Sequence, residues 1–209
     1  MNTKLLKKRI FELSYRNRLS HVGSCLTALP IMMDIYNKMS SGDKFICSAG
    51  HSHLAHLVVM EAYGVIKDAE QALLDYGIHC DVRAGCDAST GSLGHGVSIA
   101  LGMAIADRKN NVYCLMTDGE LAEGSCWEAF RIQREQQVDN LQIVVNMNGW
   151  SALGKVDTKI LRNKIYFMSN AVVENALPIE DDFPYLAGLQ GHYHVLTEAE
   201  YIHALGVLQ

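Results

Sequence analysis

The sequence predicts an α/β protein in which a parallel β-sheet is flanked by helices. Two runs, Asn111 to Thr117 and Leu141 to Asn146, are apolar at nearly every position, which is typical of strands buried on both faces. Segments with helical character lie before and between them, at Val97 to Arg108 and Ser125 to Gln137. Strands that alternate with helices along a chain usually pair in parallel, so we expect the sheet to lie between two layers of helices.

The remaining segments supply further elements of the same architecture. Lys44 to Ser48 is a short apolar run that predicts another buried strand. Helices are predicted at Leu5–Leu19, Leu26–Met39, Ser52–Ala62 and Ala69–Asp75, and Thr197 with Glu200 forms a capping box for a last one. Lys159 to Ser169 fits a helix and a strand equally, and no element is predicted from Val172 to Leu189. No linker or repeat divides the chain, so we expect a single domain over residues 1–209.

The composition is that of an ordinary globular protein and argues against two classes of partner. Of 209 residues 49% are hydrophobic, and 18 basic against 23 acidic residues give a net charge of −5, which disfavours nucleic acid. No uncharged apolar run is long enough to span a membrane, and the charged first residues predict no secretory leader. Six cysteines without C-x-x-C spacing predict reduced thiols. We therefore expect a cytoplasmic protein.

Polar residues directly follow the two central strands. Asp118-Gly119-Glu120 comes after the first strand and Asn148-Gly149 after the second. The carboxyl ends of parallel strands share one edge, so Asp118 and Asn148 are expected to converge where α/β folds bind ligands. A carboxylate, an amide oxygen and the backbone carbonyl of Trp150 suit an octahedral Mg²⁺ that also binds a diphosphate. Asp-Gly and Asn-Gly also form ordinary turns, and spacing alone leaves that alternative open.

A glycine-rich segment, Gly77 to Gly96, is long for a loop and is therefore a candidate binding segment. Its end, Thr90 to Gly96 (TGSLGHG), leads into the helix predicted at Val97, where free backbone N–H groups can bind an anion. No lysine follows as in a P-loop, which disfavours nucleoside triphosphates. A tight entry into the helix explains the glycines equally well.

Histidine is abundant, with nine residues, and His51-x-His53-x-x-His56 resembles a zinc-binding pattern. On a helix, however, His51 and His53 project about 200° apart, and only His53 and His56 share a face. A zinc site is therefore not predicted.

Four blocks of sequence together resemble the transketolase family. Ser20 to Ser24 (SHVGS) and Phe45 to His51 (FICSAGH) are similar to two of its motifs, and Ala88 to Ala104 (ASTGSLGHGVSIALGMA) is similar to a third almost residue for residue. The fourth runs from Asp118 to Asn148, 30 residues apart, and resembles the thiamine diphosphate motif. The resemblance covers about residues 15 to 155, with the part after about residue 155 shortened. It is greatest to the small, cofactor-binding subunit of split transketolases.

The resemblance implies the thiamine diphosphate-binding fold, with thiamine diphosphate and Mg²⁺ as cofactors. It assigns the metal to Asp118, Asn148 and the carbonyl of Trp150. It places His51, Gly91, Ser92, Leu93, Gly119, Glu120 and Asn148 at the cofactor. It gives catalytic roles to His21, His51, His79, Glu123 and His192. His51 would lie near the diphosphate. His21, His79 and His192 would line the substrate channel, where they can move protons, and Glu123 would lie between two cofactor domains.

The implied reaction is the transfer of a two-carbon ketol unit between sugar phosphates. A pyrimidine-binding domain on a second, C-terminal transketolase-like polypeptide would complete the site, because one α/β domain uses all of this chain. Two copies of the cofactor domain would associate, giving a heterotetramer. Two alternatives stay open: part of a decarboxylating enzyme similar to 1-deoxyxylulose-5-phosphate synthase, and a cofactor-binding assembly subunit without turnover.

Overall fold

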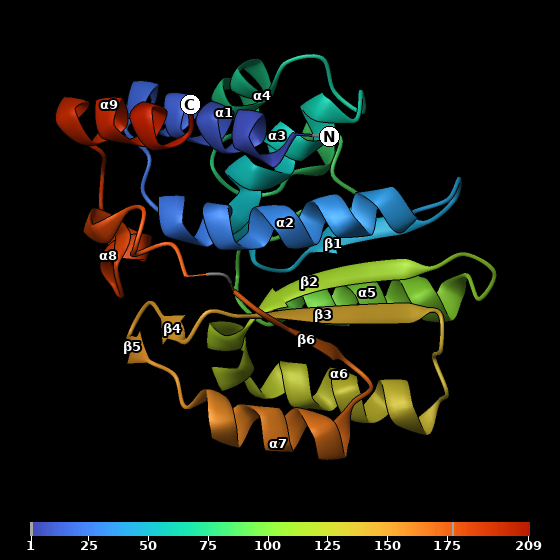
Figure 1. Cartoon of the computed structure of the whole chain (residues 1–209). Helices are drawn as coiled ribbons and strands as arrows, with labels where there is room; N and C mark the ends of the chain where they lie inside the picture. Colours follow the sequence, from blue (N-terminus) through green and yellow to red (C-terminus); the bar gives the residue numbers. More distant parts are fainter. Residues whose placement is uncertain (1, 177) are drawn as a thin grey trace.

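A computed structural model describes residues 2–176 and 178–209 and has a four-stranded parallel sheet at its centre (Figure 1). The strands are β1 (Lys44–Cys47), β2 (Val112–Thr117), β3 (Leu141–Met147) and β6 (Val172–Asn175), and they lie in this order across the sheet. Every adjacent pair is parallel. All four carboxyl ends therefore lie at one edge of the sheet.

Helices cover both faces of this sheet (Figure 1). One layer contains α1 (Thr3–Arg16), α2 (Val22–Lys38), α3 (His53–Ala62), α4 (Ala69–Tyr76) and α9 (Glu198–Val207), and the other contains α5 (His95–Ala106), α6 (Gly124–Glu135) and α7 (Thr158–Met168). Short elements complete the connections: the β4 (Trp150–Ser151) and β5 (Gly154–Lys155) hairpin, α8 (Gln190–Tyr193), and the 3₁₀ turns η1 (Gly50–Ser52), η2 (Val82–Ala84), η3 (Asp118–Ala122) and η4 (Pro184–Leu186).

Two hydrophobic cores lie on opposite sides of the sheet. Leu115 of β2 packs in the core with α1 to α4, whereas its neighbours Cys114 and Met116 pack in the core with α5, α6 and α7. Successive side chains of a strand point to opposite faces, so a strand that is covered on both sides must be apolar throughout. This explains why the central strands lack the alternation of a half-exposed strand.

The architecture confirms the predicted fold class, and the differences lie at helix ends and in the last part of the chain. α2 begins earlier than predicted, at Val22, and continues through Pro30. α5 begins at His95, because Gly94 adopts a left-handed conformation (φ +78°) that ends the loop before it. The ambiguous segment after Lys159 is helical as α7. The segment from Val172, for which the sequence predicts no element, begins with the short edge strand β6.

The described residues also bear on the two expectations from composition. None of their helices combines the length and the apolar character that crossing a membrane requires. All six cysteines are buried and free.

Candidate functional site

The ends of β2 and β3 bring Asp118 and Asn148 together at the carboxyl edge of the sheet. Asp118 begins η3, and one of its carboxylate oxygens accepts a hydrogen bond from the Gly149 N–H (2.6 Å), next to Asn148. The Asn148 amide oxygen accepts from the Trp150 N–H (2.8 Å). A Cβ atom built on Gly119 would lie 3.6 Å from the Trp150 carbonyl oxygen. These contacts place a carboxylate, an amide oxygen and a backbone carbonyl on adjoining loops, and such oxygens are the ligands that a hard divalent cation prefers.

Asp118 is almost fully buried, with 1% of its surface exposed. Desolvation raises the pKa of its carboxyl group to about 6, although backbone hydrogen bonds from Gly149 and Gly119 act in the opposite direction. A cation bound here would supply the counter-charge that the buried carboxylate needs. The residues at the strand ends thus fit a metal ion of the predicted class.

Glu120 links three loops around this edge. Its buried carboxylate accepts hydrogen bonds from the Ser48 hydroxyl (2.6 Å), the Gly94 N–H (3.1 Å) and the Thr117 N–H (3.1 Å). These donors stand at the ends of β1, of the glycine-rich segment and of β2. The Glu120 side chain therefore holds the three loops in register, and its direct contact with a cofactor stays a prediction.

The glycine-rich segment lies directly against the turn that follows β1. A Cβ atom on Gly50 would come within 2.7 Å of the Gly91 Cα atom, and one on Gly96 within 2.5 Å of the Ser48 Cα atom. No side chain fits between backbones this close, so glycine is required at both positions. Ser92 next to them is exposed, so a ligand can reach this part of the segment.

Three of the predicted histidines form a cluster beside the same edge. The ring centroid of His21 lies 5.3 Å from that of His51 and 5.7 Å from that of His192, and the His51 and His192 centroids are 6.1 Å apart. These residues come from the start of α2, from η1 and from α8, and the His21 N–H donates to the His192 carbonyl (3.0 Å). His79 joins His21 and His51 around a cavity of about 40 Å³. The fold therefore gathers four histidines that are far apart in the sequence.

Burial keeps the clustered rings uncharged. Desolvation, reinforced by neighbouring histidines, lowers the pKa of His21 to about 4 and that of His51 to about 3, and desolvation also lowers the pKa of His192. Within the described residues one nitrogen of each ring is buried without a hydrogen-bond partner: Nδ1 of His21, Nε2 of His51 and Nδ1 of His192. Buried polar atoms are normally paired. These unpaired atoms mark a surface that a polar ligand would satisfy.

A second cavity, of about 240 Å³, also borders His192. Its wall includes Ser24, Asn148, Trp150 and Glu180. Ser24 and Glu180 are additions to the predicted residues. Ser24 belongs to the SHVGS motif and could have been predicted from it. Glu180 lies in a segment with neither a motif nor a helical or strand periodicity, so the sequence does not indicate it.

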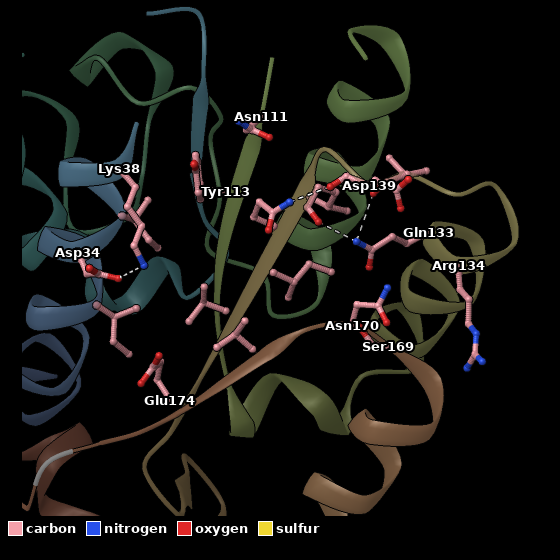
Figure 2. A pocket seen from close by; sticks show the side chains of 18 of the residues that line it. Asp34, Lys38, Asn111, Tyr113, Gln133, Arg134, Asp139, Ser169, Asn170 and Glu174 are labelled. Carbon is pink, nitrogen blue, oxygen red and sulfur yellow. Dashed lines mark hydrogen bonds and ion pairs between the residues drawn. The ribbon is translucent and has the colours of Figure 1, made fainter. Parts of the chain in front are cut away.

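A groove of about 920 Å³, larger than these two cavities, lies elsewhere, over the sheet between α2 and β6 (Figure 2). Figure 2 shows Asp34 and Lys38 of α2 paired on one side of it and Ser169 and Asn170 on the other. Its wall contains none of the residues predicted for the cofactor or the substrate. The candidate site is therefore at the strand ends, where the two smaller cavities lie.

Glu123 is on the surface, at the residue before α6. A Cβ atom on Gly94 would lie 2.7 Å from the Glu123 Cβ atom, so the carboxylate stands beside the glycine-rich segment. This position leaves Glu123 accessible to a second chain.

The fold and the donor set at the strand ends suit an α/β domain that binds a diphosphate through a hard metal ion. Residues 20–166 match the family described as transketolase, thiamine diphosphate binding domain, and the chain belongs to this family. It is 32% identical over 162 residues to an apulose-4-phosphate transketolase subunit of Phocaeicola vulgatus and 31% identical over 166 residues to the transketolase of Homo sapiens. These alignments cover 68% and 69% of this chain, but 58% and 26% of the relatives. The chain thus spans just over half of the first relative and about a quarter of the second.

Solved transketolases share the fold over nearly the whole chain. The transketolase of Campylobacter jejuni superposes with a TM-score of 0.70 at 17% identity and covers 100% of this chain and 46% of that one. A transketolase mutant from Pichia stipitis gives a TM-score of 0.76 at 18% identity, with 97% and 40% covered. This likeness confirms the predicted parallel-sheet fold.

Proposed function

We propose that the chain binds thiamine diphosphate and Mg²⁺ and forms the cofactor half of an enzyme that transfers a two-carbon ketol unit between sugar phosphates. The observation that carries the proposal is the meeting of Asp118, Asn148 and the Trp150 carbonyl at the ends of β2 and β3. Membership of the transketolase family supports the cofactor. The name of the Phocaeicola vulgatus relative, which describes one subunit of a transketolase, supports the class of reaction.

In this proposal Asp118, Asn148 and the Trp150 carbonyl hold the metal, which neutralises the buried carboxylate. Gly119 lets the η3 backbone lie against β4, since a Cβ atom there would be 3.2 Å from Ser151. The diphosphate would bind beside Gly119 and the metal, with the glycine-rich segment facing the rest of the cofactor. When bound, thiamine diphosphate supplies the nucleophilic carbon that accepts and passes on the ketol unit.

The histidine cluster would handle the substrate. His21, His51 and His79 line a cavity next to the proposed cofactor position, and His192 stands beside them. Sugar hydroxyls are natural partners for the unpaired nitrogens of His21, His51 and His192. Desolvation lowers the pKa of His21, His51 and His192 and so keeps these rings neutral near pH 7. Each neutral ring has one nitrogen that can accept a hydrogen bond from a substrate hydroxyl.

A second polypeptide with a pyrimidine-binding domain would complete the site. α5 supports association with other chains, because its sequence is apolar on nearly every side, yet Ser98, Gly102 and Ile105 are exposed. A helix of this kind is normally buried. We infer that two cofactor domains associate through this region, near Glu123, and that a partner subunit covers the cofactor. A cytoplasmic location is part of the proposal, since six buried free thiols suit a reducing compartment.

Calorimetry tests the cofactor part of the proposal. Thiamine diphosphate with Mg²⁺ is titrated into the parent chain and into Asp118→Ala. We expect the variant to lose Mg²⁺-dependent binding, because the diphosphate cannot approach without its counter-charge. Equal affinity of both proteins would place the metal elsewhere and would remove the support for Asn148 and Trp150.

A ketol-transfer assay tests the reaction and the partner. The chain is assayed at micromolar concentration alone and together with a candidate pyrimidine-binding polypeptide, with thiamine diphosphate and Mg²⁺ present. Activity is expected only from the mixture. Full activity of the chain alone would contradict the need for a partner. Release of carbon dioxide from pyruvate would favour the decarboxylating alternative, and cofactor binding without turnover in the mixture would favour an assembly role.

A further inference from the structure

A second cluster of ligating side chains lies between α3 and the segment that follows α4. It consists of His53 and His56 of α3 and of Cys80 and Cys86, which stand on either side of η2. All four residues are buried, and one ligand atom of each lies within 4.8 Å of the other three. We propose that these four residues bind one Zn²⁺ ion as a structural site.

The local backbone explains how the four side chains meet. His53 and His56 are three residues apart on one helix and therefore share a face. Asp81 caps the η2 turn with its side chain, and its carbonyl accepts a hydrogen bond from the Cys86 N–H (3.4 Å). This turn returns the chain so that Cys80 and Cys86 both face α3.

The distances require only small rotations to close the site. Nδ1 of His56 lies 3.9 Å from the Cys80 sulfur and 3.7 Å from the Cys86 sulfur. Zinc bonds of about 2.0 to 2.3 Å in a tetrahedron hold the ligand atoms roughly 3.3 to 3.8 Å apart. Two of the six edges of the tetrahedron are therefore already close to their final length.

The surroundings of the two histidine rings favour metal binding in different ways. The Tyr36 hydroxyl lies 2.7 Å from Nε2 of His56, which leaves Nδ1 directed at the sulfurs. A hydrogen bond on the far ring nitrogen commonly orients a metal-binding histidine. His53 is completely buried, and within the described residues neither of its ring nitrogens has a hydrogen-bond partner. A ring buried in this way has lost its hydrogen bonds to water without replacement, and a metal bond would satisfy one nitrogen.

The donor set selects the metal and the type of site. Two thiolates and two neutral imidazoles carry two negative charges together, which one Zn²⁺ ion balances in a dry interior. Four protein ligands leave no position for water or substrate, which is typical of structural zinc sites rather than catalytic ones. Binding releases the two thiol protons. The oxygen donors around Asp118 form a separate, harder site that suits Mg²⁺.

A zinc ion here would fix one wall of the candidate cofactor site. His79 precedes Cys80, and its ring would be 3.0 Å from a Cβ atom on Gly91. The Thr90 N–H donates to the Cys80 carbonyl (3.1 Å), and the Thr90 hydroxyl donates to the Cys47 carbonyl (2.6 Å). The metal would therefore hold the glycine-rich segment and His79 against the end of β1. Its role would be to position these residues.

Metal content is the first test. The chain is purified from zinc-supplemented cells in reducing buffer, without thiamine diphosphate, and zinc and magnesium are measured by plasma mass spectrometry. We expect one zinc per chain. After removal of zinc by a chelator, Co²⁺ should give the visible bands of a tetrahedral ion and a thiolate charge-transfer band in the unmutated chain. Protein that holds no zinc and shows no thiolate band with Co²⁺ would overturn the proposal.

Variants then assign the ligands. Cys80→Ser and Cys86→Ser should each lose stoichiometric zinc, and Tyr36→Phe should weaken Co²⁺ binding about 10- to 100-fold. Cys114→Ala is the matched control, because this buried thiol lies in β2 outside the cluster, and it should keep the metal. Full zinc content in both serine variants would overturn the assignment, as would a disulfide between Cys80 and Cys86 in freshly purified protein. None of these measurements requires thiamine diphosphate, so they are independent of the ketol-transfer result.

Discussion

Replacing Asp118 by asparagine should stabilise the protein without cofactor and destroy its affinity for cofactor. The carboxylate is buried at the carboxyl edge of the sheet, where desolvation raises its pKa from 3.8 to about 6. Asparagine has nearly the same shape and no charge. The substitution therefore separates the cost of burying the charge from the benefit of having a metal ligand there.

The magnitude follows from the two pKa values. Each pH unit between them is worth about 1.4 kcal/mol, so the ionised carboxylate costs the folded chain about 3 kcal/mol of stability above roughly pH 6. The cost disappears as the pH falls toward about 4, because the folded state then binds the proton before the unfolded state does. In asparagine the amide NH₂ would face one of the two backbone donors, Gly119 or Gly149, at a cost of about 1 to 2 kcal/mol. Asp118→Asn should thus raise the free energy of unfolding by about 1 to 2 kcal/mol at neutral pH.

Urea unfolding followed by circular dichroism measures this difference across the pH range. At a thiamine diphosphate concentration about 100 times its Kd, with Mg²⁺, the parent should gain about 2.7 kcal/mol. The variant should gain almost nothing, because its affinity should fall by more than about 100-fold. The order of the two stabilities should therefore reverse when the cofactor is added.

Asp157→Asn is the matched control. Asp157 is exposed and caps α7 by accepting a hydrogen bond from the Ile160 N–H (3.0 Å). Asparagine caps helices about as well as aspartate, so the control should change stability by less than about 0.5 kcal/mol. An Asp118→Asn variant less stable than the parent at neutral pH without cofactor would refute a cost of burying this carboxylate. A gain that stayed unchanged near pH 4 would also refute it.

Three further outcomes are expected. His51→Ala and His192→Ala should lower turnover with the partner subunit by about 10²- to 10⁴-fold with little loss of cofactor affinity. His203→Ala, at an exposed residue of α9, is the control and should change neither quantity. Steady-state kinetics and calorimetry measure the two effects, and a loss of cofactor affinity alone would contradict the catalytic roles of His51 and His192. Gly50→Ala should lower the free energy of unfolding in urea by about 1 to 3 kcal/mol, because its Cβ atom would meet the backbone of the glycine-rich segment at 2.7 Å. An unchanged urea midpoint would contradict this close packing. In the isolated chain Gly102→Ala should raise the free energy of unfolding by about 0.5 to 1 kcal/mol, since a Cβ atom on this α5 glycine would have open space around it. A lower free energy of unfolding would contradict this and would indicate that another part of the protein packs on α5.

The elements with strong local signals were predictable. The central strands, apolar on both faces, had to be buried between helices, and the Asp118 and Asn148 positions followed from where those strands end. β6 could not be predicted from the sequence, because most of this four-residue edge strand is exposed and its residues show no alternation of apolar and polar side chains. Glu180 stayed hidden for a similar reason, since it reaches the 240 Å³ cavity from a stretch with neither helical nor strand periodicity.

The side-chain clusters likewise contain some residues whose positions the sequence predicts and others that only the structure places. The sequence by itself determined the fold class and predicted the carboxyl edge as the binding position, because hydrophobic periodicity and the alternation of strands and helices can be read from short stretches of chain. It also identified His53 and His56 as neighbours on a helix face, but not the two cysteines beside them, since their spacing matches no common metal pattern. Only the tertiary structure decided that Cys80 and Cys86 lie against α3 and that His192 joins His21 and His51. The physical reason is that contacts between distant residues depend on the path of the loops, and these loops are fixed by glycine contacts, buried carboxylates and turns that act only once the chain has folded.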